Sequence, residues 1–477
     1  MQREKFPCEP GKEGTKVLSI QALSTASHAR MSTQASAAPI DGAKVYSKIS
    51  WRLIPYIFVL YILAYLDRVN VGFAALEMKR DLHLSATVYG LGAGLFFLGS
   101  SSFDLPSNLA LTKFGPRHWI ARIMISWGVI AAAMSFIRGA HSFEAMRFLL
   151  GVTEAGFFPG MILYLTFWFP SKERAKAVAK FMTATSIAGV IGAPIASALL
   201  KLEGVGHLHG WQWLFIAEGV PTFLMGFSVL WVLKDKPDDA AWLSDDEKHW
   251  LDGELEKDRK SGGAEEKHSL GDAFRTPMVW VLAGVFFLEQ IGTYTVNLWM
   301  PLILDNFLSH GAHAHGGELS AGAASLVARY ATLPYVAAAI FTVIVGWSSD
   351  RTGERRWHIA GCMLFGAIGF TWAGLTHSFV FALCAMTLAT MGFWSMMGPF
   401  WALPTRILGG QAAAGGVAII TMVGGVGGFL GPFLTGRLRD LTHGFSGGLF
   451  TIAGLSVIAA LLCFALKSPP KGASGTA

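Results

Sequence analysis

Residues 53–76 read LIPYIFVLYILAYLDRVNVGFAAL, an apolar run that contains an acid, a base and an amide. About 20 apolar residues suffice for a helix to cross a bilayer, so the run predicts a transmembrane helix. A charged side chain at the centre of such a helix costs roughly 2.5–3.5 kcal/mol on insertion scales. We therefore expect Asp67 and Arg68 to face protein or water. A functional site is the first interpretation, and a mutually neutralised pair that only fixes helix packing is the alternative.

The composition of the whole chain is that of a membrane protein. Of its 477 residues, 52% are hydrophobic and 15% are charged, against about 25% charged residues in soluble domains. The net charge of +6 comes from Lys and Arg in short loops between apolar runs, so nucleic-acid binding is not indicated. The four cysteines lack the spacing of metal ligands. We expect no metal, no cofactor and no enzyme activity.

Twelve apolar runs are long enough to span a bilayer, and they predict an all-α polytopic membrane protein with two six-helix halves. The spans lie at about 53–76, 86–109, 118–139, 144–168, 177–200, 211–233, 277–304, 321–348, 357–376, 379–402, 411–436 and 446–467. The domains follow as a disordered tail (1–50), a bundle (51–233), a connector (234–275), a second bundle (276–467) and a tail (468–477). Ser244 and Glu247 predict a capped helix in the connector. Met31 is a candidate for the true start.

The distribution of Lys and Arg in short loops predicts that both termini are cytoplasmic. Inner loops would hold Lys113, Arg117, Arg122, Lys172, Arg174, Lys176, Lys180, Arg351, Arg355, Arg356 and Arg406, and outer loops Lys79, Arg80, Arg138, Lys201, Arg437 and Arg439. Arg437 and Arg439 run against this distribution. We expect a monomeric, multi-pass protein of a bacterial inner membrane.

The two halves repeat in sequence. Residues 115–119 (GPRHW) recur as 353–357 (GERRW), and residues 189–194 (GVIGAP) recur as 427–432 (GGFLGP), both at a displacement of 238 positions. Parallel repeats of six spans place a substrate site at their interface and move by rocking one half against the other.

Residues 346–356 (GWSSDRTGERR) resemble the loop signature of the major facilitator superfamily, G-x-x-x-D-R-x-G-x-R, in its second-half position. The resemblance implies a gating loop formed by Asp350, Arg351, Gly353 and Arg355. The first-half copy, residues 108–117, departs from the signature. Thr112 stands where the acid is expected and Lys113 stands where the Arg is expected.

A finer resemblance rests on five stretches, YLDRVNVGFA (65–74), RFLLGVTEAGFFPG (147–160), WFPSKERAKA (168–177), GWQWLFIAEGVP (210–221) and SDRTGERR (349–356). Together they resemble the anion:cation symporter branch of that superfamily, which includes permeases for tartrate, phthalate, hydroxyphenylacetate and galactonate, and the resemblance covers residues 45–467. It implies roles for the acid and Arg of the D-R pair and for the Arg and Glu of R-x-x-x-G-x-x-E. Here these are Asp67, Arg68, Arg147 and Glu154.

The residues themselves point to proton coupling at the same place. Arg147 and Glu154 are two helical turns apart and share a face, and Glu154 should lie at a depth similar to that of Asp67. An acid beside a movable cation can gain and lose a proton during transport. We assign proton coupling to Asp67, Glu154 and Arg147, with a static charge network as the alternative.

The substrate site is expected around Arg68, the basic residue in the interior of the first span, because its fork can hold a carboxylate by two parallel hydrogen bonds. Helix packing is the alternative role for the other candidates. These are Tyr65 and Asn70 beside Arg68, Gln290, Tyr294 and Asn297 on one stripe of the seventh span, Glu289 next to that stripe, and Trp394 in the tenth span.

Together these observations predict a proton-coupled importer of small organic anions, working by alternating access in a lipid bilayer. Two alternatives stay open. One is export of organic anions or drugs by proton antiport, and the other is a membrane sensor that binds organic acids without moving them.

Overall fold

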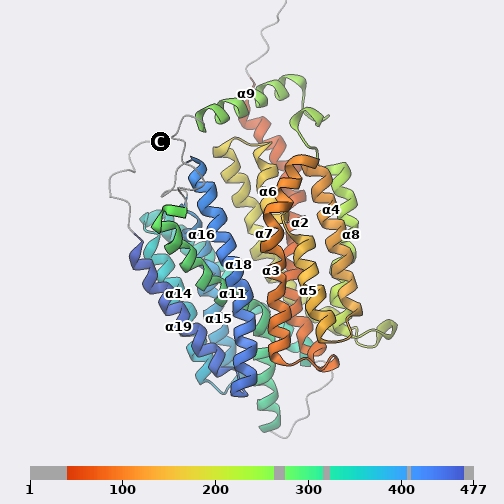
Figure 1. Ribbon diagram of the computed structural model, residues 1–477, viewed down its shortest axis with the longest axis vertical. Helices are drawn as coiled ribbons and strands as arrows, with labels where there is room; N and C mark the ends of the chain where they lie inside the picture. Colours follow the sequence, from red (N-terminus) through yellow and green to blue (C-terminus); the bar gives the residue numbers. More distant parts are fainter. Residues whose placement is uncertain (1–39, 263–273, 315–322, 405–409, 467–477) are drawn as a thin grey trace, which may run out of the picture.

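The computed structural model describes residues 40–262, 274–314, 323–404 and 410–466. The helices form two bundles that lie side by side (Figure 1). The first bundle contains α2 (Gly42–Asp81), α3 (Ala86–Phe114), α4 (Pro116–Ala133), η1 (Met134–Phe136), α5 (Ala140–Glu154), α6 (Phe157–Thr166), α7 (Ser171–Leu200), η2 (Val205–His207) and α8 (Gly210–Val232). The second contains α11 (Pro277–Ala314), α12 (Ala323–Tyr330), α13 (Thr332–Thr352), α14 (Arg356–Leu375), α15 (Phe379–Ser395), α16 (Met397–Trp401), α18 (Gly410–Thr442), α19 (Ser446–Leu462) and η4 (Cys463–Ala465).

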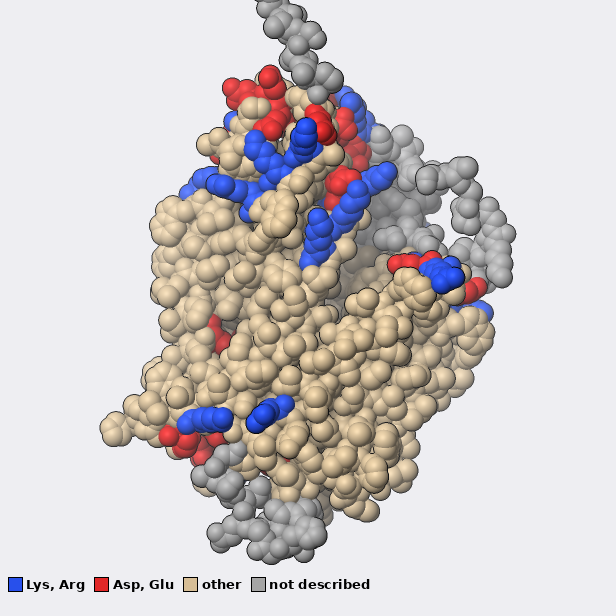
Figure 2. Space-filling model, turned by 180° about the vertical axis from the view of Figure 1, so that it is seen from behind, with Lys and Arg blue, Asp and Glu red and all other residues tan. Residues whose placement is uncertain are grey.

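Twelve helical segments in the described part of the chain are long and apolar enough to cross a membrane, six in each half. This number confirms the predicted fold. Figure 2 shows Lys, Arg, Asp and Glu side chains mainly at the two ends of the molecule, with an uncharged surface between them. The candidate start at Met31, Arg406 and the predicted tail 468–477 lie outside the described residues.

The first helix begins earlier than the sequence predicts. It starts at Gly42 and is capped by Asp41, whose carboxylate accepts a hydrogen bond from the Ala43 N–H at 3.2 Å. Val45 and Ile49 are buried. The predicted disordered tail 1–50 is therefore wrong for residues 42–50, because a cap and two buried apolar side chains extend the helix.

The connector contains the predicted capped helix, here α9 (Asp245–Gly262), preceded by η3 (Pro237–Asp239). The Glu247 N–H donates to the Ser244 hydroxyl at 3.2 Å, and the Ser244 N–H donates to the Glu247 carboxylate at 2.9 Å. This reciprocal pair is the capping box. The helix lies across one end of the molecule (Figure 1), which we call the connector face; the other end is the opposite face.

Three spans are broken where the sequence predicts continuous helices. In the eighth span α12 ends at Tyr330 and α13 begins at Thr332. In the fourth span α5 ends at Glu154, and Gly156 takes a left-handed conformation with φ of +82° before α6 begins. In the tenth span α15 ends at Ser395, and α16 begins with Met397 and Gly398. The breaks in the fourth and tenth spans fall in corresponding spans of the two halves, so these two follow the internal repeat.

The halves pack most closely through α3 and α18. A Cβ on Gly94 would lie 2.7 Å from the Phe429 carbonyl oxygen, so glycine permits this backbone approach. Hydrogen bonds between the halves within the described ranges run from mid-helix to the opposite face, for example from the Tyr89 hydroxyl to the Leu298 carbonyl at 2.8 Å. Figure 2 shows the two lobes parted on the connector side. The structure is thus a state closed at the opposite face.

Candidate functional site

Four charged side chains from two helices of the first half form one cluster. Asp67 and Arg68 lie in the middle of α2, and Arg147 and Glu154 lie on α5. Asp67, Arg147 and Glu154 are buried, whereas the Arg68 side chain keeps 18% of its surface exposed. Arg68 is therefore the member of the cluster that a solute reaches first.

Arg68 is held by Glu154. Its Nε donates to Glu154 Oε1 at 2.9 Å, and its Nη2 donates to the same oxygen. The other oxygen, Oε2, has no hydrogen-bond partner in the described ranges. A charge-assisted contact of this kind is among the stronger hydrogen bonds in proteins, and it orients the guanidinium.

Asp67 forms its hydrogen bond with a different helix from the one that Arg68 contacts. Its Oδ2 accepts a hydrogen bond from the indole N–H of Trp127 on α4 at 3.0 Å. Glu218 on α8 is close enough to Asp67 for their charges to interact. Both Glu218 oxygens are buried and lack a hydrogen-bond partner among described residues. The first half thus buries three acids, Asp67, Glu154 and Glu218.

Arg147 lies close enough to both Asp67 and Glu154 for their charges to interact. Its guanidinium is 4.8 Å from the centre of the Phe96 ring, and Nη2 is 3.4 Å from the Ala93 carbonyl oxygen. The Arg68 guanidinium lies 5.7 Å from the same ring. Phe96 on α3 therefore supports both cations by cation–π contact.

A further acid, Asp104, stabilises the helix break that follows Glu154. The Gly156 N–H donates to Asp104 Oδ1 on α3 at 2.7 Å. A left-handed residue here turns the chain directly after Glu154, so the carboxylate stands at a helix end instead of mid-helix. Because the α5 dipole places partial negative charge at that end, a cation such as Arg68 is favoured there.

Three of the predicted substrate residues meet across the two halves. The Asn297 amide on α11 lies 3.4 Å from the Tyr65 hydroxyl on α2. The Tyr65 ring meets Trp394 on α15 edge-on, with ring centres 5.8 Å apart. These contacts place second-half residues one helical turn from Arg68.

The other four substrate candidates are more scattered. The Tyr294 ring lies tilted against the Phe97 ring, with ring centres 3.9 Å apart, and is near Arg68, whereas Gln290 packs against α18. Glu289 is buried and accepts a hydrogen bond from Thr293, one turn along its own helix. Asn70 is buried, and its amide has no hydrogen-bond partner within the described chain.

The predicted gating loop is an ordered turn at the connector face. Arg355 donates to Asp350 Oδ1 at 2.6 Å and to the Ser349 hydroxyl at 2.8 Å. Gly353 has φ of +70°, and the Arg351 guanidinium lies 5.4 Å from the centre of the Trp347 ring. The second-half loop is thus closed on itself by an ion pair.

In the first-half copy of this loop, the carboxylate contact comes from a connector residue, Asp235. Thr112, at the position of the missing acid, donates to the Leu109 carbonyl at 2.8 Å. Asp235 accepts a hydrogen bond from the Arg117 N–H at 2.9 Å, at the start of α4. A connector carboxylate therefore caps the helix that the loop leads into.

Sequence reasoning missed Asp104, Trp127 and Glu218. Glu218 had a usable signal, because it is an acid within an apolar run. Asp104 had the same signal, because it too is an acid within an apolar run, residues 86–109. Trp127 had none, since a tryptophan in a membrane helix is ordinary until its partner is known.

Comparisons with known proteins agree with the fold and the motifs. The sequence model of the Major Facilitator Superfamily matches residues 57–432. A protein of Agrobacterium vitis named "Putative tartrate transporter" is 43% identical over 430 residues, covering 90% of this chain and 93% of the relative. A "Quinolone resistance transporter" of Acinetobacter baumannii is 37% identical over 420 residues, covering 88% and 94%.

A solved structure shares the architecture. The xylose transporter XylE from E. coli, in a partially occluded inward-open conformation, superposes with a TM-score of 0.68 at 17% identity, covering 89% of this chain and 98% of that protein. At this identity the likeness shows the fold alone. With a family match over most of the chain and relatives above 30% identity, the chain belongs to the Major Facilitator Superfamily and is a multi-pass membrane transporter of a small molecule.

Proposed function

We propose that the protein imports small organic anions with protons, by alternating access. The observation that carries the proposal is the Arg68–Glu154 contact. Arg68 is the partly exposed cation of an otherwise buried cluster, and its fork fits a carboxylate. A substrate carboxylate and Glu154 would therefore compete for the same guanidinium.

Proton uptake supplies the coupling in this scheme. Protonation makes Glu154 neutral and weakens its hold on Arg68, so the guanidinium becomes available to the substrate anion. Asp67 and Arg147 complete the proton-coupling group, because Asp67 is the second acid beside Arg147. Tyr65, Asn297, Trp394 and Tyr294 would contact the rest of the substrate. Gln290, Glu289 and Asn70 are weaker candidates in this arrangement.

The direction of transport rests on the orientation of the chain. We place the connector face in the cytoplasm of a bacterial inner membrane, because Lys and Arg in short loops are concentrated there. The structure would then be the inward-open state. The gating loop of Asp350, Arg351, Gly353 and Arg355 would rearrange when this face closes, and we propose that the transporter works as a monomer.

The substrate class follows from Arg68 together with the relative whose name refers to tartrate. The test is uptake by proteoliposomes with an imposed pH gradient, using labelled tartrate, galactonate, phthalate and hydroxyphenylacetate in turn. We expect accumulation of at least one of these anions when the outside is acidic, and collapse of accumulation with a protonophore. Equal uptake with and without the gradient would contradict proton coupling.

Export is the second candidate, because one relative is named for quinolone resistance. The same vesicles discriminate between the two directions of coupling. In antiport, a fluoroquinolone would accumulate inside vesicles whose interior is acidic. In symport, an organic anion accumulates when the exterior is acidic.

A further inference from the structure

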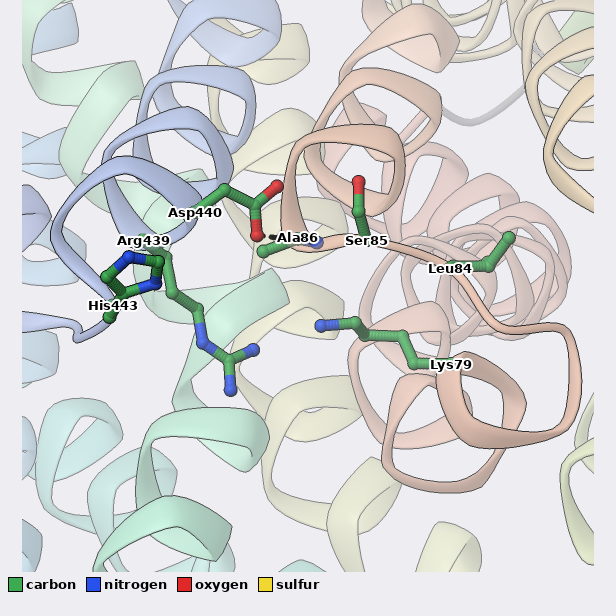
Figure 3. Close-up of a pocket in the computed structure, with 7 residues that line it drawn as sticks. All are labelled: Lys79, Leu84, Ser85, Ala86, Arg439, Asp440 and His443. Atoms are coloured by element: carbon green, nitrogen blue, oxygen red, sulfur yellow. Dashed lines mark hydrogen bonds between the residues drawn. The ribbon is translucent and has the colours of Figure 1, made fainter.

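Two cations from different halves face one another on the opposite face. Lys79 lies near the end of α2, and Arg439 lies near the end of α18. Figure 3 shows both side chains extending into the space between these helices. They line a pocket of about 490 Å³ together with Leu84, Ser85, Ala86, Asp440 and His443.

A second pocket adjoins the first across the same pair. It has a volume of about 810 Å³ and again includes Lys79 and Arg439 in its lining. The two cations are therefore shared by both hollows of this face. Their charges are close enough to repel one another, and this repulsion opposes the contact between the halves.

Neither Lys79 nor Arg439 forms an ion pair with a carboxylate in the described ranges. Lys79 Nζ lies 5.8 Å from the Trp299 ring centre, and the Arg439 guanidinium lies 4.3 Å from the Phe445 ring centre. Aromatic faces orient cations and leave their N–H donors free for an anion.

The neighbouring acid is already occupied. Asp440 accepts hydrogen bonds from the Thr87 N–H at 2.7 Å, from the Thr87 hydroxyl at 2.6 Å and from the Ala86 N–H at 3.2 Å. The second pocket is also lined by the acids Glu77, Asp81, Glu203 and Asp305. None of them forms an ion pair with Lys79 or Arg439 in this part of the structure, and Asp305 interacts with Arg439 only at a longer distance. These acids lessen the positive charge of the pair but do not occupy its donors.

We infer that Lys79 and Arg439 form a second anion site, which binds a small carboxylate from solution and bridges the two halves. Bridging would replace repulsion by attraction and favour the closed state of this face. The site would receive substrate before it reaches Arg68. The inference also gives a role to Arg439, which runs against the charge distribution of the loops. It rests on the proposed function for the identity of the anion.

The test measures L-tartrate and sulfate binding to the full chain by calorimetry, in detergent without phospholipid so that no lipid headgroup competes. In an Arg68→Ala background, which disables the proposed central site, we expect a residual saturable component. Adding Lys79→Gln or Arg439→Gln should weaken that component by about tenfold. Arg437→Gln is the matched control, because Arg437 lies on the same helix outside both pockets.

The outcomes separate the two proposals. If Arg68→Ala binds neither tartrate nor sulfate, or if Arg437→Gln weakens the component as much as Arg439→Gln does, the second site is overturned. If Arg68→Ala binds as tightly as the original chain, the central site fails while the second site is still judged by its own variants. Removing one like charge should also leave the ligand-free melting temperature unchanged or raised, and a marked fall would assign Lys79 and Arg439 a structural role instead.

Discussion

Arg68 donates two hydrogen bonds to a single oxygen of Glu154, Oε1, and the second oxygen has no partner in the described residues. A carboxylate that used both oxygens would satisfy the guanidinium fork better than this arrangement does. The contact with Glu154 therefore orients Arg68. A substrate carboxylate that used both of its oxygens would bind the same guanidinium with better geometry. This relationship connects anion binding to the protonation of Glu154.

Replacing Arg68 tests the carboxylate clamp. Arg68→Ala should weaken the tighter component of anion binding by roughly 10- to 100-fold, the worth of a charged hydrogen bond. Arg68→Lys keeps the charge but not the fork, so its affinity for the anion should fall between that of the original chain and that of Arg68→Ala. Calorimetry measures this affinity, and its ligand is the anion that the vesicles are found to accumulate. Arg122→Ala is the control, because Arg122 is exposed and stacks on Trp119. Undiminished affinity in Arg68→Ala would disprove the clamp.

Neutralising Asp67 or Glu154 tests proton coupling. We expect Asp67→Asn and Glu154→Gln to fold, to lose accumulation driven by a pH gradient, and to keep exchange of internal for external anion, since exchange needs no net proton movement. Counterflow and gradient-driven uptake in the same proteoliposomes distinguish the two activities. Trp127→Phe is the companion variant, because it removes the donor to Asp67 and keeps the acid. Uphill uptake by Asp67→Asn at the original rate would reject the assignment.

The membrane fold could be predicted because each span carries its own signal. Run lengths gave twelve spans, and the capping box at Ser244 and Glu247 was visible as a local pattern. Asp67, Arg68 and Glu154 were identifiable for a similar reason, since charges within apolar runs are costly. In all these cases the deciding information lies within a few residues of the chain.

What failed depended on contacts between distant segments. The break after Glu154 needs Gly156 in a left-handed conformation and an acceptor from α3, Asp104. A glycine within an apolar run predicts neither the conformation nor the acceptor. The partner of Asp67, Trp127, comes from another helix. The missed helical start at Gly42 is the exception, because its cap at Asp41 is a local contact that follows a polar, Ser-rich sequence.

The break at Gly156 should be intolerant of a side chain. A Cβ there would lie 2.5 Å from Ser107 Cβ, and the left-handed conformation costs a non-glycine residue about 1–2 kcal/mol. Gly156→Ala should therefore lower the melting temperature and reduce uptake by moving Glu154. Gly139→Ala is the control, because nothing lies within 4 Å of a Cβ at that position. Equal melting temperatures for the two variants would show that the turn is not strained.

A pH-dependent contact ties the α7–α8 loop together on the opposite face. His209 Nδ1 lies 2.8 Å from Glu203 Oε1, and Asp81 is 3.5 Å away. The hydrogen bond to Glu203, with the charge of Asp81, raises the pKa of His209 above its ordinary 6.5. Partial burial raises the pKa of the Glu203 carboxyl. Hydrogen bonds from the Gly210 N–H and from His209 lower this pKa by more, so that it lies below its ordinary value.

The sign of the pH effect follows from these two shifts. A raised histidine pKa contributes stability that is fully present below pH 6.5 and is lost as the pH rises through the higher folded-state value. A lowered Glu203 pKa contributes stability above about pH 4.5 that is lost as the pH falls through the lower folded-state value. The melting temperature of the original chain should thus exceed that of His209→Gln by more at pH 6 than at pH 8.5. His377→Gln, exposed in a loop of the same face, should show no such difference. A gap that widened with rising pH would mean that His209 acts as a neutral acceptor and not as a cation.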